Sequence, residues 1–420
     1  MRILLSFVVL SFFGGSLNQK NKKLEFIDKS YEEEIKTVQL YPNSGNPQDV
    51  FSAPVAPINQ NTLVLEFDDL VESHEDYRVR LIHCNADWTQ SKLKPLDYLS
   101  TYNEFMINQF QYSVDTKIGY VHYTFKLPNV KLTGNYLLVA YRGSNTRDII
   151  LSKRFMVYQR KVGIEVTSNK IGLTSVDRRR QKIDFEVRYP QFEILNPQDQ
   201  VKVVVRQNQR WDNAMFDVQP QFIKDGQRLL EYRFFDRKDN FLAGNEYRIF
   251  DMRSIRYPGQ NVARVDMDTY PSTAHLMIDK PRSYQAYAQY DDINGDYYIQ
   301  NTDTGNGEVQ SDYLNVVFSL AKDQSLDGEV YVIGKMNNYS PTQPMRNGNG
   351  NRLEYRTILK QGIYNYQYLI KGDTLSRNFI EGDHFDTENE YEILVYFRPL
   401  NMPADLLIGY APVTLNTRNN

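Results

Sequence analysis

Cysteine, tryptophan and histidine are scarce in this chain of 420 residues, which has one Cys, two Trp and five His. The single cysteine, Cys84, excludes an intrachain disulfide framework, so packed cores must stabilise the fold. The histidines form no HExxH motif, and the sequence has neither a CxxC pair nor a GxSxG elbow. These absences disfavour zinc and serine-hydrolase chemistry, and we expect no cofactor and no metal.

A strong net charge is also lacking, because 49 basic side chains nearly balance 52 acidic ones and leave a formal charge of −3. Such a chain has no global field to attract a phosphate backbone, so nucleic acid is not an expected partner. After residue 17, no apolar run approaches the roughly 20 residues that a membrane helix needs. We therefore expect a mature protein without a membrane span.

The first 16 residues have the pattern of a secretory signal peptide. Met1 and Arg2 form a short positive region, an apolar stretch runs from Ile3 to Phe13, and Gly14 to Ser16 offers a small-residue cleavage site. A buried N-terminal strand is the alternative, but the sequence turns polar and basic directly afterwards. No cysteine follows the apolar stretch, which excludes a lipoprotein anchor. In a Gram-negative cell, this leaves the periplasm, the periphery of the outer membrane or the medium as the expected location.

Aromatic residues are abundant, with 31 Tyr and 22 Phe, and they favour pleated, half-buried surfaces. In residues 182–189, apolar and polar side chains alternate with period two, as in a strand with one wet face. Residues 134–142 and 362–371 are further expected strands. The pattern predicts an all-β protein, with a short helix within residues 96–110 as the one helical candidate.

The expected strands fall into three groups, each of the size of a β-sandwich. We therefore predict three consecutive immunoglobulin-like β-sandwich domains that follow the signal peptide. Their expected bounds are 24–160, 161–281 and 282–398, with Pro281 at the second boundary. Residues 399–420 contain three prolines and are expected to form a tail.

One tight group of chemically active residues, His83 to Trp88, closes an expected strand. Cys84 could act as a nucleophile with a histidine as its base. However, neighbours along a strand point to opposite faces, so His83 and Cys84 cannot pair with each other. The alternative, which we favour, is a strand end in which Cys84 is a small core residue, Asp87 caps a turn and Trp88 is buried.

Residues 291–296 are rich in Asp and Asn and suggest a calcium loop. An EF-hand loop that starts at Asp292 would need glycine at position six, where the sequence has Tyr297. The motif therefore fails, and an Asn-Gly hairpin turn is the simpler interpretation.

The third group of strands resembles the early-set immunoglobulin-like domains that are related to glycogen-binding modules. The resemblance lies in residues 330–339 and 366–373. Such modules commonly place a Trp where this chain has Tyr339, and both Trp residues lie elsewhere. This departure makes the resemblance an indication of fold more than of ligand. The alternative function is an outer-membrane-associated glycan-binding module with Asn338 and Tyr339 as its platform.

A second resemblance extends over nearly the whole mature chain. It is carried, in this order, by residues 77–88, 120–128, 133–136, 154–163, 206–215 and 229–257. Together these segments resemble the type IX secretion system plug family of secreted β-rich proteins from Bacteroidota. None of them is a catalytic signature. Five residues in them are expected to serve the fold: His83, Cys84, Asp87, Trp88 and Trp211.

The resemblance implies a periplasmic protein that binds the periplasmic end of the large outer-membrane translocon barrel. It would block the channel when no substrate is passing. The family is not enzymatic, and neither a catalytic residue nor a small-molecule substrate is expected. A glycosidase would need two carboxylates on facing elements, and no pair in the sequence stands out.

Overall fold

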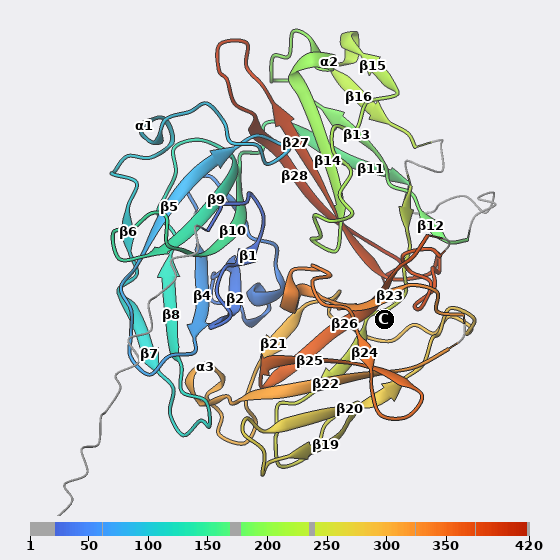
Figure 1. Cartoon of the computed structure of the whole chain (residues 1–420). Helices are drawn as coiled ribbons and strands as arrows, with labels where there is room; N and C mark the ends of the chain where they lie inside the picture. The colour runs from blue at the N-terminus through green and yellow to red at the C-terminus, as the bar shows by residue number, and fades with distance from the viewer. Residues whose placement is uncertain are drawn as a thin grey trace, which may run out of the picture.

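The computed structural model describes residues 22–417, apart from residues 61, 169–177, 235–239, 324 and 374. The expected signal peptide, residues 1–16, lies outside the described residues. The described chain folds into three β-sandwiches (Figure 1). Its α-helices have four residues each: α1 (Pro95–Tyr98), α2 (Pro197–Gln200) and α3 (Gly307–Gln310). The all-β class is therefore confirmed.

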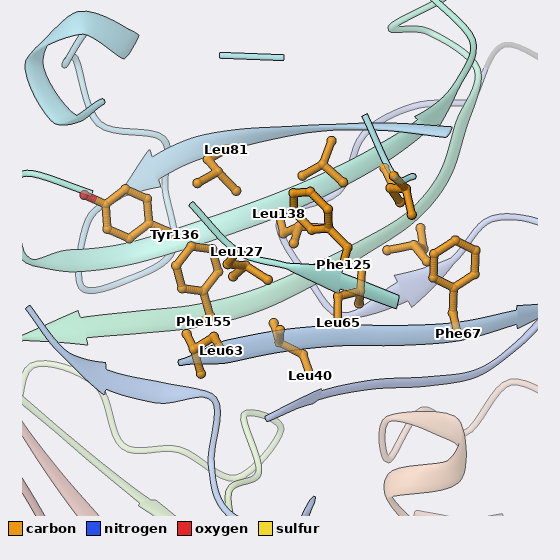
Figure 2. Close-up of a cluster of buried hydrophobic side chains, with 14 of the residues drawn as sticks. Leu40, Leu63, Leu65, Phe67, Leu81, Phe125, Leu127, Tyr136, Leu138 and Phe155 are labelled. Carbon is orange, nitrogen blue, oxygen red and sulfur yellow. The ribbon is translucent and has the colours of Figure 1, made fainter. Parts of the chain in front are cut away.

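The first sandwich is formed by the N-terminal part of the chain. Its first sheet contains β1 (Lys29–Ser30), β10 (Ile149–Tyr158), β9 (Gly134–Arg142), β5 (Tyr77–Cys84) and β6 (Phe105–Met106), with β3 (Val55–Pro57) beside β10. Its second sheet contains β2 (Ile35–Pro42), β4 (Leu63–Asp69), β8 (Val121–Lys126) and β7 (Gln109–Tyr112). Leucine and aromatic side chains from both sheets, such as Leu65, Phe67 and Leu138, meet in the core (Figure 2).

The second sandwich is completed by the last strands of the chain. One sheet contains β11 (Gly163–Ser168), β13 (Asp184–Arg188), β16 (Leu229–Tyr232) and β15 (Phe222–Lys224). The other contains β14 (Val201–Gln207), β27 (Asn389–Phe397) and β28 (Leu406–Leu415). In Figure 1, the red β27 and β28 lie beside the green β14. Two short strands from the same part of the sequence, β12 (Arg180–Gln181) and β17 (Phe241–Leu242), pair with each other in a separate two-stranded sheet.

The third sandwich is inserted into the second one: its strands follow β17 and precede β27 in the sequence. One sheet contains β18 (Arg248–Asp251), β26 (Gly362–Lys371), β21 (Tyr297–Ile299) and β23 (Glu329–Ile333). The other contains β19 (Val262–Asp266), β20 (Thr273–Asp279), β22 (Tyr313–Ala321), β25 (Arg352–Lys360) and β24 (Arg346–Asn347). Short 3-10 turns include η1 (Pro47–Phe51), η2 (Asp225–Gln227) and η4 (Lys335–Asn337).

The strand pairing corrects the expected division after residue 161. The second and third domains were expected at 161–281 and 282–398, but β18, β19 and β20 belong to the third sandwich and β27 belongs to the second. Residues 399–420 are not simply a tail, because β28 runs through them. The reason is physical: pairing between distant strands depends on backbone hydrogen bonds, which local alternation of side chains does not show. The three sandwiches are therefore not consecutive along the chain.

The expected helix within residues 96–110 is also wrong. Only α1 is helical there, and Phe105–Met106 pairs with β5 while Gln109–Tyr112 pairs with β8. The local spacing of apolar residues indicated a helix, but the two neighbouring sheets offer this segment backbone partners. Tertiary pairing outweighs a weak helical propensity.

Strands that are buried on both faces, among them β9 and β27, join the first and second sandwiches. In β9, Leu138 points into the core of the first sandwich, whereas Leu137 and Val139 point away from it. In β27, Ile393 points into the core of the second sandwich, whereas Leu394 points away from it. The outward side chains of the two sheets form a further apolar core, which the two sandwiches share.

A buried polar cluster joins the first sandwich to the third. The carboxylate of Asp68 on β4 lies 2.6 Å from Lys360 Nζ and 2.6 Å from Tyr313 Oη, and it lies 2.7 Å from His122 Nδ1. Asp68 is 0% exposed and Lys360 is 1% exposed. Burial alone would raise the pKa of Asp68, but the Lys360 ammonium and the His122 hydrogen bond hold it below its ordinary value.

Truncation after residue 402 tests the correction of the domain bounds. It removes β28, which contributes Ile408 and Leu415 to the second core and Leu407 to the shared core. We expect loss of the cooperative thermal transition and rapid proteolysis, because β27 keeps only β14 as a partner and becomes an exposed edge strand, and two cores are opened. Circular dichroism and limited proteolysis measure this. Truncation after residue 417 is the control and should leave the midpoint unchanged, whereas a stable 402-residue chain would contradict the topology.

Asp68→Asn tests the buried cluster. Because it leaves the Lys360 ammonium without its carboxylate, it should cost about 3 kcal/mol of unfolding free energy at pH 7. The folded-state pKa of Asp68 is depressed, so its contribution is present above the ordinary value of 3.8 and is lost as the pH falls through the folded-state value. Below about pH 4 the wild type should therefore lose stability more steeply than the variant.

Urea unfolding at several pH values measures this difference. The control is Asp327→Asn, at an exposed position of the third sandwich, which should change stability by less than about 0.5 kcal/mol. Equal effects of the two substitutions would show that the cluster does not stabilise the interface.

Candidate functional site

The segment His83 to Trp88 forms the end of β5 and the turn that follows it. Asp87 Oδ1 accepts hydrogen bonds from the backbone N–H and the hydroxyl of Thr89, at 3.0 and 2.6 Å. Trp88 has a φ of +64° and is 3% exposed. The turn thus directs the Trp88 indole into the core that the first and second sandwiches share.

His83 and Cys84 point to opposite sides of β5. His83 packs edge-to-face against Tyr136, and its Nε2 lies 3.2 Å from the carbonyl oxygen of Thr133. Cys84 is fully buried in the shared core. Burial lowers the pKa of His83 to about 4 and raises the pKa of the Cys84 thiol to about 12. At neutral pH the imidazole is uncharged and the thiol is protonated, so this pair is unsuited to nucleophilic catalysis.

Gly134 lies directly against His83. Its φ is +142°, and a Cβ at this position would lie 2.5 Å from His83 Nε2. A side chain here would collide with a buried ring, so the close packing of β9 on His83 requires glycine.

The two tryptophans of the chain meet in space, although they are far apart in the sequence. The rings of Trp88 and Trp211 are 4.9 Å apart and almost perpendicular, at 82°. The Arg154 guanidinium lies 4.8 Å from the Trp88 ring and 5.5 Å from the Trp211 ring. Arg206 lies 4.3 Å from the Trp211 ring. We call these four residues the Trp–Arg stack; it connects the first sandwich with the second.

Arg206, whose guanidinium lies against the Trp211 ring, also forms an ion pair with a buried carboxylate. Its Nε lies 2.6 Å from Glu392 Oε2, and its Nη2 donates to Glu392 Oε1 at 2.8 Å. Arg206 and Glu392 are 1% and 0% exposed. Sequence reasoning missed Arg154, Arg206 and Glu392. A signal was present, since Arg206 ends the apolar run of β14 on the same face as the buried Val204.

The C-terminal segment holds the turn that carries Trp88. Asp405, which is 0% exposed, accepts a hydrogen bond from the Ala86 backbone N–H at 3.1 Å and pairs with Arg398 at 2.6 Å. Tyr396 donates its hydroxyl to Asn135 Oδ1 at 2.8 Å. Residues 396–405 are therefore part of this site.

A cavity of about 560 Å³ lies where the three sandwiches meet, beside the Trp–Arg stack. All three sandwiches contribute to its wall. Its polar and aromatic lining includes Asp28, Phe51, Lys153, Arg154, Arg206, Gln209, Arg210, Trp211, Asp212, Asn294, Asp296, Lys335, Asn338, Tyr339 and Glu390.

Most charges in this wall are paired. Arg210 donates two hydrogen bonds to Asp212, at 3.0 and 2.8 Å, and Lys335 pairs with Asp296. Glu390 differs, because burial and the neighbouring Glu392 raise its pKa to about 7. The cavity therefore contains a carboxyl group whose pKa lies near neutral pH.

Asn338 and Tyr339 do not form an exposed glycan platform. Tyr339 is 7% exposed, and the Arg210 guanidinium covers its ring at 4.6 Å. Asn338 Oδ1 lies 3.3 Å from Lys153 Nζ of the first sandwich. Both residues face the cavity between domains, because the turn after η4 adopts positive φ values of 52° and 54°. The expected platform is thus wrong for these residues.

Within the described residues, no group of three or more His, Cys, Asp and Glu side chains could hold a metal ion. The loop at Asp292 is a turn, in which Asp292 Oδ1 accepts the Asn294 backbone N–H at 2.8 Å. No helix among the described residues is long and apolar enough to cross a membrane.

Residues 35–159 match the family model described as "Type 9 secretion system plug protein 1st domain". A crystal structure of a hypothetical protein from Parabacteroides merdae ATCC 43184, at 2.30 Å resolution, superposes with a TM-score of 0.85. The two sequences are 32% identical over 93% of this chain and 100% of the other. No curated protein matches the chain.

Trp211→Leu tests the Trp–Arg stack. The substitution keeps an apolar side chain but removes the ring that both guanidinium groups face, so it should cost about 2 kcal/mol of unfolding free energy. Urea unfolding followed by circular dichroism measures this. The matched control is Phe216→Leu, because Phe216 stacks on Trp211 but is 41% exposed, and it should change stability by less than about 0.5 kcal/mol. A similar small effect for both variants would contradict the role of the stack.

Proposed function

Because the chain belongs to the type 9 secretion system plug protein family, we propose that it closes the channel of that system's large outer-membrane barrel. It would bind the barrel at the periplasmic end when no substrate is passing. The family membership places the chain in type 9 secretion; the barrel, the periplasmic location and the channel closure are the proposal.

The observation that carries this proposal is the way in which the three sandwiches are joined. The first and second share an apolar core, and the first and third share the buried Asp68–Lys360 pair. A compact body of about 400 residues has a radius of gyration near 21 Å, and as a uniform sphere it would be about 55 Å across. Such a body can obstruct a wide pore sterically, because its parts cannot separate without opening a buried interface.

The exposed surface offers aromatic contacts for a protein partner. Four tyrosines in the described loops are between 78% and 83% exposed: Tyr102, Tyr257, Tyr270 and Tyr284. Tyrosine combines a large contact area with a hydroxyl and loses little conformational entropy on binding. Reversible contacts of this kind suit a body that must leave the channel when a substrate arrives.

Deletion of the gene tests the proposal. The outer membrane should become permeable to large hydrophilic molecules that it normally excludes, while secretion itself continues, because only the closure of an existing channel is lost. Uptake of a large fluorescent dextran measures permeability. Expression of the full chain from a plasmid should restore the barrier, and expression of the chain truncated after residue 402 should not. An intact barrier in the deletion strain would contradict the proposal.

A further inference from the structure

The cavity between the three sandwiches has the size and position of a ligand site. Its volume of about 560 Å³ lies within the roughly 300–1,000 Å³ that is typical of small-ligand pockets, which occur preferentially at domain interfaces. The proposed closure of a channel uses the outer surface of the protein, so it assigns no role to this interior space.

Two cations of the first sandwich bring spare hydrogen-bond donors to the cavity. Arg154 Nε and Nη2 both donate to one acceptor, the carbonyl oxygen of Phe26, and no carboxylate among the described residues forms a salt bridge with Arg154. Lys153 lies 3.7 Å from Asp28 Oδ1 and 3.3 Å from Asn338 Oδ1. Each side chain could donate a further hydrogen bond to an anion.

Two acceptors among the lining residues, Asn294 and Glu390, have unused capacity. Asn294 Oδ1 is buried without a hydrogen-bond partner in the described part of the chain. The Glu390 carboxyl group likewise has no hydrogen bond to any described residue, and its raised pKa follows from burial. A buried acceptor without a donor is costly, so Asn294 would gain from a ligand that donates a hydrogen bond, and the half-buried Glu390 carboxyl group can accept another.

The charges in the wall favour one negative group on the ligand. The wall contains five cations: Lys153, Arg154, Arg206, Arg210 and Lys335. Three of them are neutralised by Glu392, Asp212 and Asp296, and Asp28 compensates Lys153 in part. With Glu390 protonated, these four carboxylates face five cations, and the one remaining positive charge is shared by Lys153 and Arg154, which both lie beside Asp28.

Aromatic and apolar side chains complete the wall, and its backbone is held in an unusual conformation. Phe51, Trp211 and Tyr339 face the space. Asn208, Gln209, Asn294, Asn338 and Tyr339 all have φ between 50° and 57°. Non-glycine residues rarely adopt this region, and such residues cluster at ligand sites.

We propose that this cavity binds a short peptide segment that carries one carboxylate and an adjacent apolar side chain. The carboxylate lies against Lys153 and Arg154, the backbone N–H groups donate to Asn294 and Glu390, and the apolar side chain packs on Trp211. A simple inorganic anion would use the cations but neither the acceptors nor the aromatic wall. Because all three sandwiches line the cavity, an occupied site resists their separation.

Intrinsic fluorescence tests the proposal, since Trp88 and Trp211 are the only tryptophans of the chain and both lie in the stack beside the cavity. The full mature chain is titrated with acetylated tripeptides, Gly-Gly-Phe and Gly-Gly-Leu, that have a free C-terminal carboxylate. We expect a saturable change in emission. The same peptides with C-terminal amides should bind at least about tenfold more weakly, because they lack the charge-assisted hydrogen bonds.

An amidated peptide with an internal aspartate, Gly-Asp-Phe, distinguishes the two sources of carboxylate. Binding of this peptide identifies a side-chain carboxylate, and binding of only the free-terminus peptides identifies a chain terminus. Inorganic phosphate should give no saturable change. If neither type of carboxylate peptide gives a saturable change up to millimolar concentration, or if the neutral amides bind equally well, the proposal is wrong.

Two variants locate the binding. Lys153→Met should weaken binding about tenfold, whereas Lys161→Met, at an exposed position that follows the same strand, should not affect it. Glu390→Gln keeps the acceptor and removes the competing negative charge, so it should retain or strengthen binding at pH 8. The unfolding midpoint confirms that each variant is folded. Unchanged binding by Lys153→Met, or loss of binding by Glu390→Gln, would place the peptide elsewhere.

Discussion

The antiparallel pairing of β14 with β27 is the constraint on which the other parts of the structure depend. It joins residues that are far apart in sequence, such as Arg206 and Glu392, which are 186 positions apart. The pairing completes the second sandwich, because it brings the chain back to that sandwich after the third one has been formed. Because the same sheet also buries Val204 and Leu394 against the first sandwich, the pairing creates the shared core as well.

The buried ion pair follows from this register. Arg206 is tolerable in an apolar interior only because β27 places Glu392 directly opposite, and the Trp211 ring covers the other side of the guanidinium. Removing water from one charge without the other would be costly. The Trp–Arg stack, the turn that carries Trp88 and the wall of the cavity are therefore consequences of one strand pairing. These contacts bind the first and second sandwiches into one body, as the proposed closure of a channel requires.

The sequence predicted local structure well and long-range structure poorly. The strands Gly134–Arg142 and Gly362–Lys371 have the expected bounds, because alternation and flanking turns are local signals. Insertion of the third sandwich could not be predicted, since β27 could pair with several strands of similar pattern. The opposite orientations of His83 and Cys84 followed from strand geometry alone. The meeting of Trp88 with Trp211 did not, because it depends on how two sheets pack.

Amide hydrogen exchange of the full chain, followed by mass spectrometry, tests the central claim that the three sandwiches form one cooperative body. Peptides from β9, β27 and β26 report on the shared core, the second sandwich and the third sandwich. The account predicts that all three open with the same free energy, equal to that of global unfolding. Exchange from β26 or β27 at a clearly lower free energy than from β9 would show that the sandwiches open independently, and would contradict it.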